Sequence, residues 1–558
     1  MSNNIFGIKK LALAFCVFIL GIIPAHAQDN QELMPIDKPY STAIESSGLY
    51  QHDSPNSLGN GLYHGADRKS IAALLQKTVN NTPWITQNTL IRKLLLTQAD
   101  TGILENTAPL SPENDLLVGR LKALLSLGMQ KQAFQLYTNL ENSKGHSDLH
   151  YYGIISMLMS NEKTLACVEI KTLFPQYKDQ SEWQVLSTYC SVSLSDTEIS
   201  QNEKHILDNS ILKAIYEQPG FVFPYTPTDF ESLPLKDRAL LIAEKSIDLS
   251  KFSISDLKEI PASHVQSLLF NETISISQRL ILTFRGVSVG VIEPKALRTL
   301  YYEISKKIED QKRNATELEK IAILYVEMEK SWLKSSKIKF LKEILNYAKA
   351  HGHATLVPFM RMLADIDLEE LEVGFNDIEI LLHAAIIGDI ELPLDWSYSL
   401  VGITVENKEE KKLRDRLIAS SFLLSDPTKA SKKKHSVIVD IIAQSQSAIL
   451  NNVKSIIENI DIRLNNHANV MLHYENKLEL YGNKSYKMPS YALLYAIKDA
   501  SVGSVASVIL LSNIALEKRE QGIIYAGTLA FICEALNKIG LTKEAHYILS
   551  EYIIRAEE

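Results

Sequence analysis

Apolar residues recur three and four positions apart along most of this chain, which is the spacing of one face of an α-helix. The pattern is clearest in segments 121–140, 236–248, 294–308, 314–332, 338–350, 376–387, 411–424, 436–460, 491–516 and 533–552. The 558 residues include only 23 Gly and 18 Pro, and these residues cluster between the apolar segments. The sequence therefore predicts an all-α fold and not a fold of many short strands and turns.

Two of these segments, 121–140 and 533–552, share one pattern. When Gly128 is placed on Gly540, the flanking positions match in size and polarity. The matched pairs are Ala123 with Ala535, Leu124 with Leu536, Leu127 with Ile539, Met129 with Leu541, Ala133 with Ala545 and Leu136 with Ile548. A glycine ends a helix because it tolerates the left-handed cap conformation, and a small Ala lets the next helix approach closely. The pattern therefore predicts an antiparallel pair of helices in each segment.

These helical hairpins resemble tetratricopeptide-like (TPR-like) repeats, whose units pack side by side into a superhelix. The resemblance covers the two segments above, with weaker echoes at 150–174 and 183–207, and the full repeat signature is absent. It implies an α-solenoid of stacked antiparallel hairpins with a long surface for binding. It does not indicate which ligand binds there.

Composition changes mark the expected domain boundaries. Segment 28–67 mixes Pro and Gly with Asn, Ser and Asp and shows little periodicity, which predicts a flexible N-terminal segment. The proline-rich stretch 219–234 and the lysine-rich stretch 426–435 are the expected internal boundaries. The expected domains are an N-terminal helical-repeat domain at 68–218, a middle helical domain at 235–425 and a C-terminal helical-repeat domain at 436–558.

Residues 1–27 have the three parts of a secretory signal peptide. Two lysines precede the apolar run 11–23, and small residues end the segment, which predicts cleavage between Ala27 and Gln28. The run is shorter than the about 20 residues that a membrane-spanning helix needs, and no later apolar stretch is long and charge-free enough to span a bilayer. We therefore expect a periplasmic protein without a transmembrane span in the mature chain, with secretion as the alternative.

The acidic balance of the chain bears on its partners. The formal net charge is −8 at pH 7, while apolar residues (46%) and charged residues (22%) have ordinary shares. An acidic chain repels phosphate backbones, so the composition argues against nucleic-acid binding as a main role. A protein or peptide is the expected partner.

Two of the cysteines are candidates for a disulfide. Cys167 and Cys190 lie in successive helical patterns that Pro175 separates, at similar heights on antiparallel helices. An oxidising compartment would allow a disulfide here, which would contribute roughly 3 kcal/mol to stability. The alternative is a pair of buried free thiols. The export signal favours the disulfide, and we expect Cys533 to be a buried helix residue.

One motif suggests catalysis. Gly286, Ser288 and Gly290 match the G-x-S-x-G nucleophile elbow of serine hydrolases. That elbow needs a strand before the serine and a helix directly after it, whereas segment 276–284 is compatible with either strand or helix and the next helix starts only at Pro294. No alternation of strands and helices surrounds the motif. We therefore expect a glycine-capped helix end and no catalytic residue.

No metal or cofactor site is expected. The acidic run 365–372 lacks the glycine that a calcium loop needs at its sixth position. Neither the pair His351 and His353 nor the pair His467 and His473 has the spacing of a zinc motif. The chain also lacks a phosphate-binding loop and a dinucleotide fingerprint.

Together these features predict a non-catalytic helical-repeat protein that is exported and acts as a protein- or peptide-binding scaffold in the bacterial cell envelope. Binding would use a concave helical face that displays Tyr, Asn and charged side chains. The alternatives are an envelope hydrolase that uses Ser288 on a peptidoglycan or ester substrate, and a secreted effector.

Overall fold

The computed structural model describes residues 44–104, 115–140, 146–195, 210–218, 220–269, 271, 273–311, 313–363, 366–425, 432–460, 489–517 and 526–556. All of these residues belong to one compact unit, 41–558. The expected signal peptide and its cleavage site between Ala27 and Gln28 lie outside the described residues.

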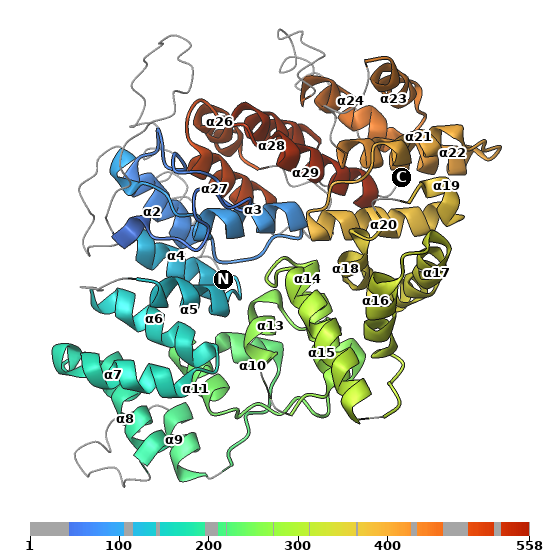
Figure 1. Cartoon of the computed structure of the whole chain (residues 1–558). Coiled ribbons are helices and arrows are strands. Elements are labelled where there is room, and N and C mark those ends of the chain that lie inside the picture. The colour runs from blue at the N-terminus through green and yellow to red at the C-terminus, as the bar shows by residue number, and fades with distance from the viewer. Residues whose placement is uncertain are drawn as a thin grey trace, which may run out of the picture. The chain divides into compact units, whose positions relative to one another are not determined.

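The described part of the chain is helical (Figure 1). Its first part contains η1 (Ile44–Ser46), α2 (Arg68–Lys77), α3 (Ile85–Leu96), η2 (Thr101–Ile103), α4 (Asp115–Ser126), α5 (Gln130–Thr138), α6 (Ser147–Met159), α7 (Lys163–Tyr177), α8 (Ser181–Ser195) and α9 (Ser210–Glu217), where η denotes a 3₁₀-helix.

The middle part alternates short and long helices, several of which start at a side-chain cap. These are α10 (Pro227–Ser232), α11 (Leu235–Ala243), α12 (Ile254–Lys258), α13 (Ala262–Leu268), α14 (Ile276–Ser288), α15 (Lys295–Gln311), α16 (Lys320–Lys330), α17 (Lys334–His351), η4 (His353–Leu356), α18 (Val357–Met360), α19 (Leu368–Leu371), α20 (Phe375–Gly388), α21 (Asp395–Gly402) and α22 (Lys408–Leu423). Ser253 and Ser275 form capping boxes with Asp256 and Gln278, which satisfy backbone N–H groups that a helix start leaves unpaired.

The last part contains α23 (Lys432–Gln444), α24 (Ala448–Ile460), α26 (Tyr491–Ala500), α27 (Val505–Leu516), α28 (Ala526–Lys538) and α29 (Thr542–Arg555). Within the described residues, β-type pairing is limited to isolated bridges between Tyr50 and Thr97, Phe223 and Ile247, and Leu392 and Ser425. The predicted all-α class is therefore confirmed. In the same part of the chain, no helix is both long and apolar enough to cross a membrane.

One type of helix end recurs at six places in the described residues. In each, a residue with positive φ follows the helix, and the next N–H donates to the carbonyl five residues before it. The positive-φ residues are Gly128, Asn161, Lys245, Gly290, Asp389 and Gly540. The three glycine ends include both glycines of the sequence repeat and the glycine-capped end predicted at the G-x-S-x-G motif.

The two segments of the sequence repeat have the same local structure. Gly128 joins α4 to α5 with φ 86°, and Gly540 joins α28 to α29 with φ 83°. After each glycine, an N–H···O bond of 2.8 Å closes the turn, from Met129 to Leu124 and from Leu541 to Leu536. The small residues Ala133 and Ala545 are fully buried at the matched position of the second helix. The predicted helical hairpins are therefore present in both segments.

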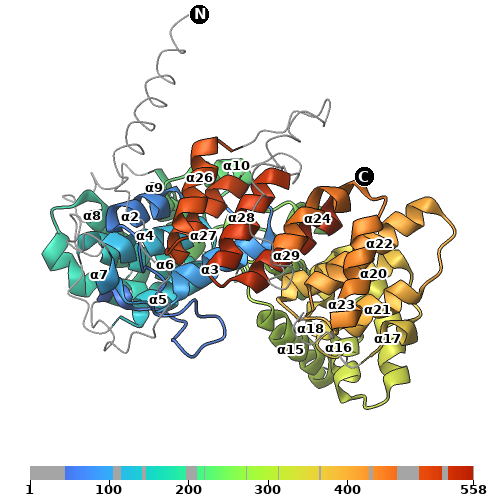
Figure 2. The same ribbon diagram turned by 90° about the horizontal axis from the view of Figure 1, so that it is seen from above.

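The C-terminal helices pack against helices from the beginning of the described chain. Helix α3 contacts α27, α29 and α20, and α2 contacts α27 (Figure 2). Glu551 on α29 is fully buried and accepts hydrogen bonds from the backbone N–H groups of Ile85 and Thr86, at 2.9 and 3.2 Å. The carboxylate therefore caps the N-terminus of α3, which favours negative charge.

The predicted flexibility of residues 28–67 does not hold for 44–67, which pack against the first helices. Leu62 and Tyr63 are buried, at 0% and 1% exposure. The buried Arg120 donates to the backbone carbonyls of Glu45 and Ser47, at 3.2 and 2.8 Å. An arginine at a helix position therefore orders a segment whose own composition resembles a loop.

Two long helical patterns are each divided in the structure. Segment 436–460 forms α23 and α24, and segment 491–516 forms α26 and α27. The breaks contain serines that cap the next helix: Ser447 lies at the start of α24, and the Ser504 side chain accepts from the Ser507 N–H. Pro175, expected to end its helix, lies within the last turn of α7, which continues to Tyr177.

Candidate functional site

A cavity of about 770 Å³ lies where segments from across the unit meet. Its lining comes from the α2–α3 connection (79–83) and Ile85, the end of α4 (Ser126), α10 (Glu231), the start of α13 (261–263), the end of α14 (Arg285, Ser288 and Val289), the α17–η4 junction (Gly352 and His353), α20 (His383 and Ile387) and the end of α29 (Arg555). Asparagine, arginine and histidine side chains alternate here with apolar ones. Polar and charged residues make up more than half of the lining, so the cavity is suited to a ligand with several hydrogen-bonding groups.

Local hydrogen bonds hold the α2–α3 connection at the wall of the cavity. The Asn81 amide donates to the Leu127 carbonyl at 2.8 Å, next to the turn that joins α4 to α5. The Thr82 hydroxyl donates to Asn88 at 3.0 Å, and the Asn88 amide donates to the Val289 carbonyl at 3.0 Å. The connection is therefore fastened both to the first repeat hairpin and to the end of α14.

Two arginines contribute positive charge to the cavity, with different surroundings. Arg555 has an acidic partner, because it pairs with Glu551 at 2.9 Å, and it also donates to the Pro83 carbonyl at 2.6 Å. Arg285 donates through Nε to the Ile260 carbonyl at 3.3 Å, and the structure records no ion pair for it within the described residues. Burial lowers the pKa of Arg285, and the negative charge of Glu259 opposes that shift.

Two histidines of the lining lie close together, His353 at the α17–η4 junction and His383 on α20. The ring centroids of His353 and His383 are 4.6 Å apart. Burial lowers the pKa of His353, with a further contribution from the charge of Arg555. Burial, followed by the charges of His353 and Arg555, lowers the pKa of His383 to about 3. Both rings are therefore neutral at pH 7, and each offers one donor and one acceptor to a ligand.

Ser288 lies in this cavity, together with both histidines. It is the last residue of helix α14, and its hydroxyl donates to the Phe284 carbonyl at 2.8 Å. A nucleophile elbow needs a strand before the serine, whereas segment 276–284 is helical here. The G-x-S-x-G motif therefore occurs on a helix end and not on a strand-to-helix turn.

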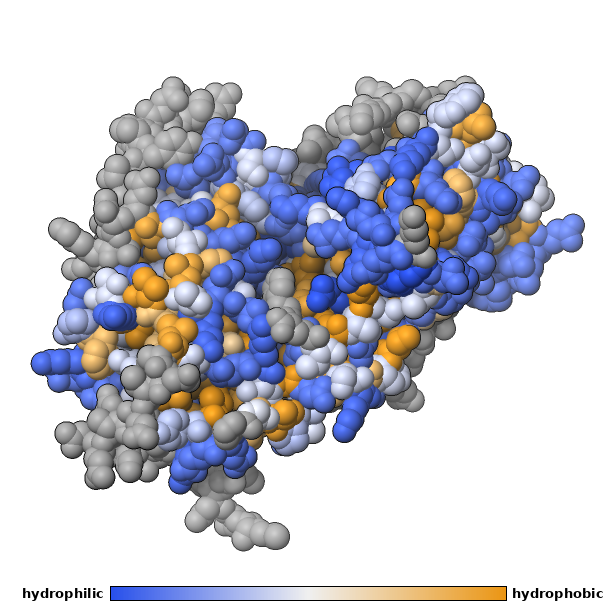
Figure 3. All heavy atoms as spheres, turned by 60° about the horizontal axis from the view of Figure 1, so that its bottom comes forward, coloured by the Kyte–Doolittle hydropathy of each residue, from blue (hydrophilic) through white to orange (hydrophobic). Residues whose placement is uncertain are grey.

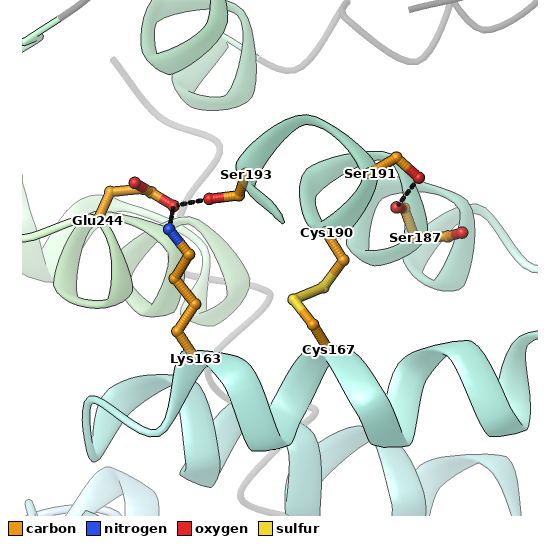
Figure 4. The surroundings of a disulfide bond; sticks show 7 residues. All are labelled: Lys163, Cys167, Ser187, Cys190, Ser191, Ser193 and Glu244. Carbon is orange, nitrogen blue, oxygen red and sulfur yellow. Dashed lines mark hydrogen bonds and ion pairs between the residues drawn. A yellow bond between two sulfur atoms is a disulfide. The ribbon is translucent and has the colours of Figure 1, made fainter. Parts of the chain in front are cut away.

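The structure brings Cys167 and Cys190 to disulfide distance, with Cα atoms 5.4 Å apart (Figure 4). They join α7 to α8. Beside them, Lys163 and Ser193 both reach Glu244 of the α11 C-cap, and the Lys163–Glu244 ion pair measures 2.8 Å. Cys533 is buried in α28, and burial raises the pKa of its thiol. The pair lies apart from the residues that line the cavity.

The acidic run 365–372 and the pair His467 and His473 are the remaining candidates of the sequence. Leu368 and Leu371 of the acidic run are buried on the short helix α19, while His467 and His473 lie outside the described residues. The part of the chain that the structure describes contains no group of three or more His, Cys, Asp or Glu placed to hold a metal ion.

Sequence reasoning missed Arg285, Arg555 and His383 as members of one site. They lie on α14, α29 and α20, which are far apart in sequence and share no motif. Arg285 is within the G-x-S-x-G region, and His353 belongs to a histidine pair that the sequence singled out. Neither signal indicates which distant segments complete the site.

Comparisons with known proteins give this site no precedent. No family model matches the chain, and no curated protein or solved structure matches it either.

Proposed function

We propose that this chain is an exported, non-catalytic, TPR-like helical-repeat protein that binds a protein or peptide partner in the bacterial cell envelope. The cavity described above is its binding site. The observation that carries the proposal is the convergence of Asn80, Asn81, Arg285 and two neutral histidines on one cavity, whose lining also includes apolar residues such as Val79 and Ile387. Amide and imidazole groups can hydrogen-bond a peptide backbone, and the apolar residues can accept its side chains.

The charges favour a partner that carries a carboxylate. Arg285 has no recorded ion pair within the described residues, and a guanidinium binds a carboxylate through two parallel hydrogen bonds. Glu231, the acidic residue of the lining, is exposed and belongs to the short helix α10. A carboxylate of a peptide side chain or C-terminus would therefore pair with Arg285.

Support for the repeat architecture comes from three hairpins, two of which are successive in the sequence. The α4–α5, α6–α7 and α28–α29 hairpins end their first helix in the same way, at Gly128, Asn161 and Gly540. Contacts between α4 and α6 and between α5 and α6 pack the first two hairpins side by side. Such stacking leaves helical surfaces available for a partner.

Site-specific photo-crosslinking in cells tests the binding site. A photoreactive amino acid at Val79, which is 44% exposed and lines the cavity, should give a discrete crosslinked product. The same residue at Val502, which is 90% exposed and not among the lining residues, is the matched control. Arg285→Gln should reduce the product at position 79. Identical products at both positions, or none at position 79, would contradict the proposal.

Export is tested by fractionation and thiol labelling. The mature chain should start at Gln28 and be recovered with the periplasm. When denatured without reductant, it should react with a maleimide at Cys533 alone, and reduction should expose Cys167 and Cys190 as well. A precursor that retains residues 1–27, or three reactive thiols before reduction, would exclude an oxidising compartment for this protein. Recovery from the culture medium would favour a secreted effector.

A hydrolase is the second candidate, because Ser288, His353 and His383 share the cavity. A serine hydrolase needs a histidine that accepts the serine proton. Here the Ser288 hydroxyl instead donates a hydrogen bond to the Phe284 carbonyl. Purified protein is assayed with ester and peptidoglycan substrates. Activity that Ser288→Ala abolishes would replace the binding proposal by the hydrolase.

A further inference from the structure

The turn between α16 and α17 exposes an unusual pair of apolar residues. Trp332 is 86% exposed and Leu333 is 45% exposed. The other three tryptophans of the chain, Trp84, Trp183 and Trp396, are buried, at 2%, 0% and 1% exposure. Figure 3 shows one face of the molecule, on which hydrophilic residues cover much of the surface and apolar ones gather in several patches. An exposed tryptophan at a turn therefore distinguishes this part of the molecule.

Lysines surround the two apolar residues. Residues 330–342 contain five lysines, and the nearest acidic residues in the sequence are Glu329 and Glu343 at the two ends of this segment. Lys334 pairs with Glu370 at 3.3 Å, and Lys342 pairs with Glu372 at 2.9 Å. The other three, Lys330, Lys337 and Lys339, have no ion pair recorded within the described residues. The turn therefore presents three lysines whose ammonium groups are not held in an ion pair recorded in the described part of the chain.

We propose that this turn is a reversible contact site for an anionic lipid bilayer surface. Trp332 and Leu333 enter the headgroup region, and Lys330, Lys337 and Lys339 bind anionic headgroups. Tryptophan favours the membrane–water interface, because its ring is apolar and its N–H can still be hydrogen-bonded there. Basic residues add attraction to anionic lipid over about a Debye length.

The composition of the turn favours a lipid surface over a protein. Protein contact sites have a contiguous apolar centre from which charged residues are depleted. Here the apolar part consists of two consecutive residues, Trp332 and Leu333, with Lys330 and Lys334 on either side. That arrangement matches interfacial anchors, in which aromatic and aliphatic residues are combined with lysines. The turn is also separate from the residues that line the cavity, so the inference does not depend on the proposed function.

Tryptophan fluorescence tests the proposal directly, because Trp332 is the exposed one of four tryptophans. The mature chain is mixed with vesicles of phosphatidylglycerol and phosphatidylcholine in equal amounts, with and without brominated acyl chains. We expect a shift of the emission to shorter wavelength and quenching by the brominated lipid. Trp332→Ser should lose both responses, and Val502→Ser should keep them, since Val502 is 90% exposed elsewhere.

The role of the lysines has its own test. Replacing Lys330, Lys337 and Lys339 with Gln should weaken vesicle binding by roughly fivefold for each residue, measured by sedimentation. Equal binding to vesicles of phosphatidylcholine alone would overturn the assignment to anionic lipid. A wild-type chain that shows no vesicle-dependent change, or a Trp332→Ser variant that still sediments equally well, would overturn the whole proposal. A response to soluble extract but not to vesicles would assign the turn to a protein partner.

Discussion

The first and last repeat hairpins, α4–α5 and α28–α29, have the same local structure but different neighbours. Their turns close with the same positive-φ glycine and the same 2.8 Å hydrogen bond. The first hairpin packs through α5 on α13, in the middle of the sequence. The last packs through α29 on α3 and α22. The local sequence pattern therefore determines that a hairpin forms. The helices packed against that hairpin determine what each of its side chains contributes to stability.

Matched positions of the two hairpins show this difference. Gln132 accepts from the Gln266 amide of α13 at 2.8 Å, whereas Glu544 at the same repeat position pairs with Lys93 of α3 at 3.1 Å. Later in the second helix of each hairpin, the matched positions also differ. Asn139 at the end of α5 is exposed, whereas Glu551 on α29 is fully buried. One repeat position thus carries a surface amide in one hairpin and a buried carboxylate in the other.

The largest expected effect is the loss of the buried Glu551 carboxylate. Glu551→Ala leaves Arg555 without its acidic partner and the N-terminus of α3 without its cap. We expect a loss of about 3–5 kcal/mol in the free energy of unfolding, measured by urea denaturation. The matched variant Asn139→Ala should change it by less than about 0.5 kcal/mol. Equal losses in the free energy of unfolding for the two variants would show that the matched positions do not differ in their contribution to stability.

The second expected effect compares the two turn glycines. A Cβ atom at Gly128 would lie 2.6 Å from the carbonyl oxygen of Ala262, whereas a Cβ at Gly540 would have no atom within 4 Å. Both substitutions force alanine into the left-handed region, but only the first also displaces α13. We expect Gly128→Ala to cost about 3 kcal/mol and Gly540→Ala about 1 kcal/mol in unfolding experiments. A larger loss at Gly540 would contradict this ranking.

The third expected effect is a pH dependence in the neighbour of the first hairpin. His264 on α13 accepts or donates a hydrogen bond with the Tyr225 hydroxyl at 2.9 Å, and helix α3 contains no histidine. Burial, with a further contribution from the charge of Arg238, lowers the pKa of His264 to about 4. Between pH 6.5 and 4 the unfolded chain therefore binds more protons at this residue than the folded one, and stability falls as the pH falls.

His264→Phe removes this titration. Between pH 6.5 and 4 the wild type should lose up to about 1.4 kcal/mol of stability per pH unit more than His264→Phe does, measured by urea denaturation at each pH. The exposed His64 is the control, and His64→Gln should follow the wild type. A parallel decline of wild type and His264→Phe would exclude His264 as the source.

Much of the secondary structure could be predicted, and the errors have local causes. The spacing of apolar residues indicated the helices, and Gly128, Gly290 and Gly540 indicated three of their ends. The ends at Asn161, Lys245 and Asp389 have the same geometry without glycine, so composition did not reveal them. The breaks before α24 and α27 depend on serine caps, a weak signal inside a continuous apolar pattern.

The cavity could not be predicted, because it depends on long-range packing. Arg285, His383 and Arg555 meet there only because α29 packs on α3 and α20. No spacing in the sequence relates the three residues. Glu551 shows the same limit, since its sequence position resembles that of the exposed Asn139 while its carboxylate caps a helix from the other end of the described chain.

The sequence by itself determined the helices and the shared turn of the two hairpins, because the spacing of apolar residues and the left-handed glycine act within a few residues. Only the tertiary structure decided which helices meet, where the cavity lies and that residues 44–67 are packed. Those features depend on which surfaces bury each other and on where single buried charges, such as Arg120 and Glu551, find partners. A buried charge is costly without a partner, and its partner can lie anywhere in the chain.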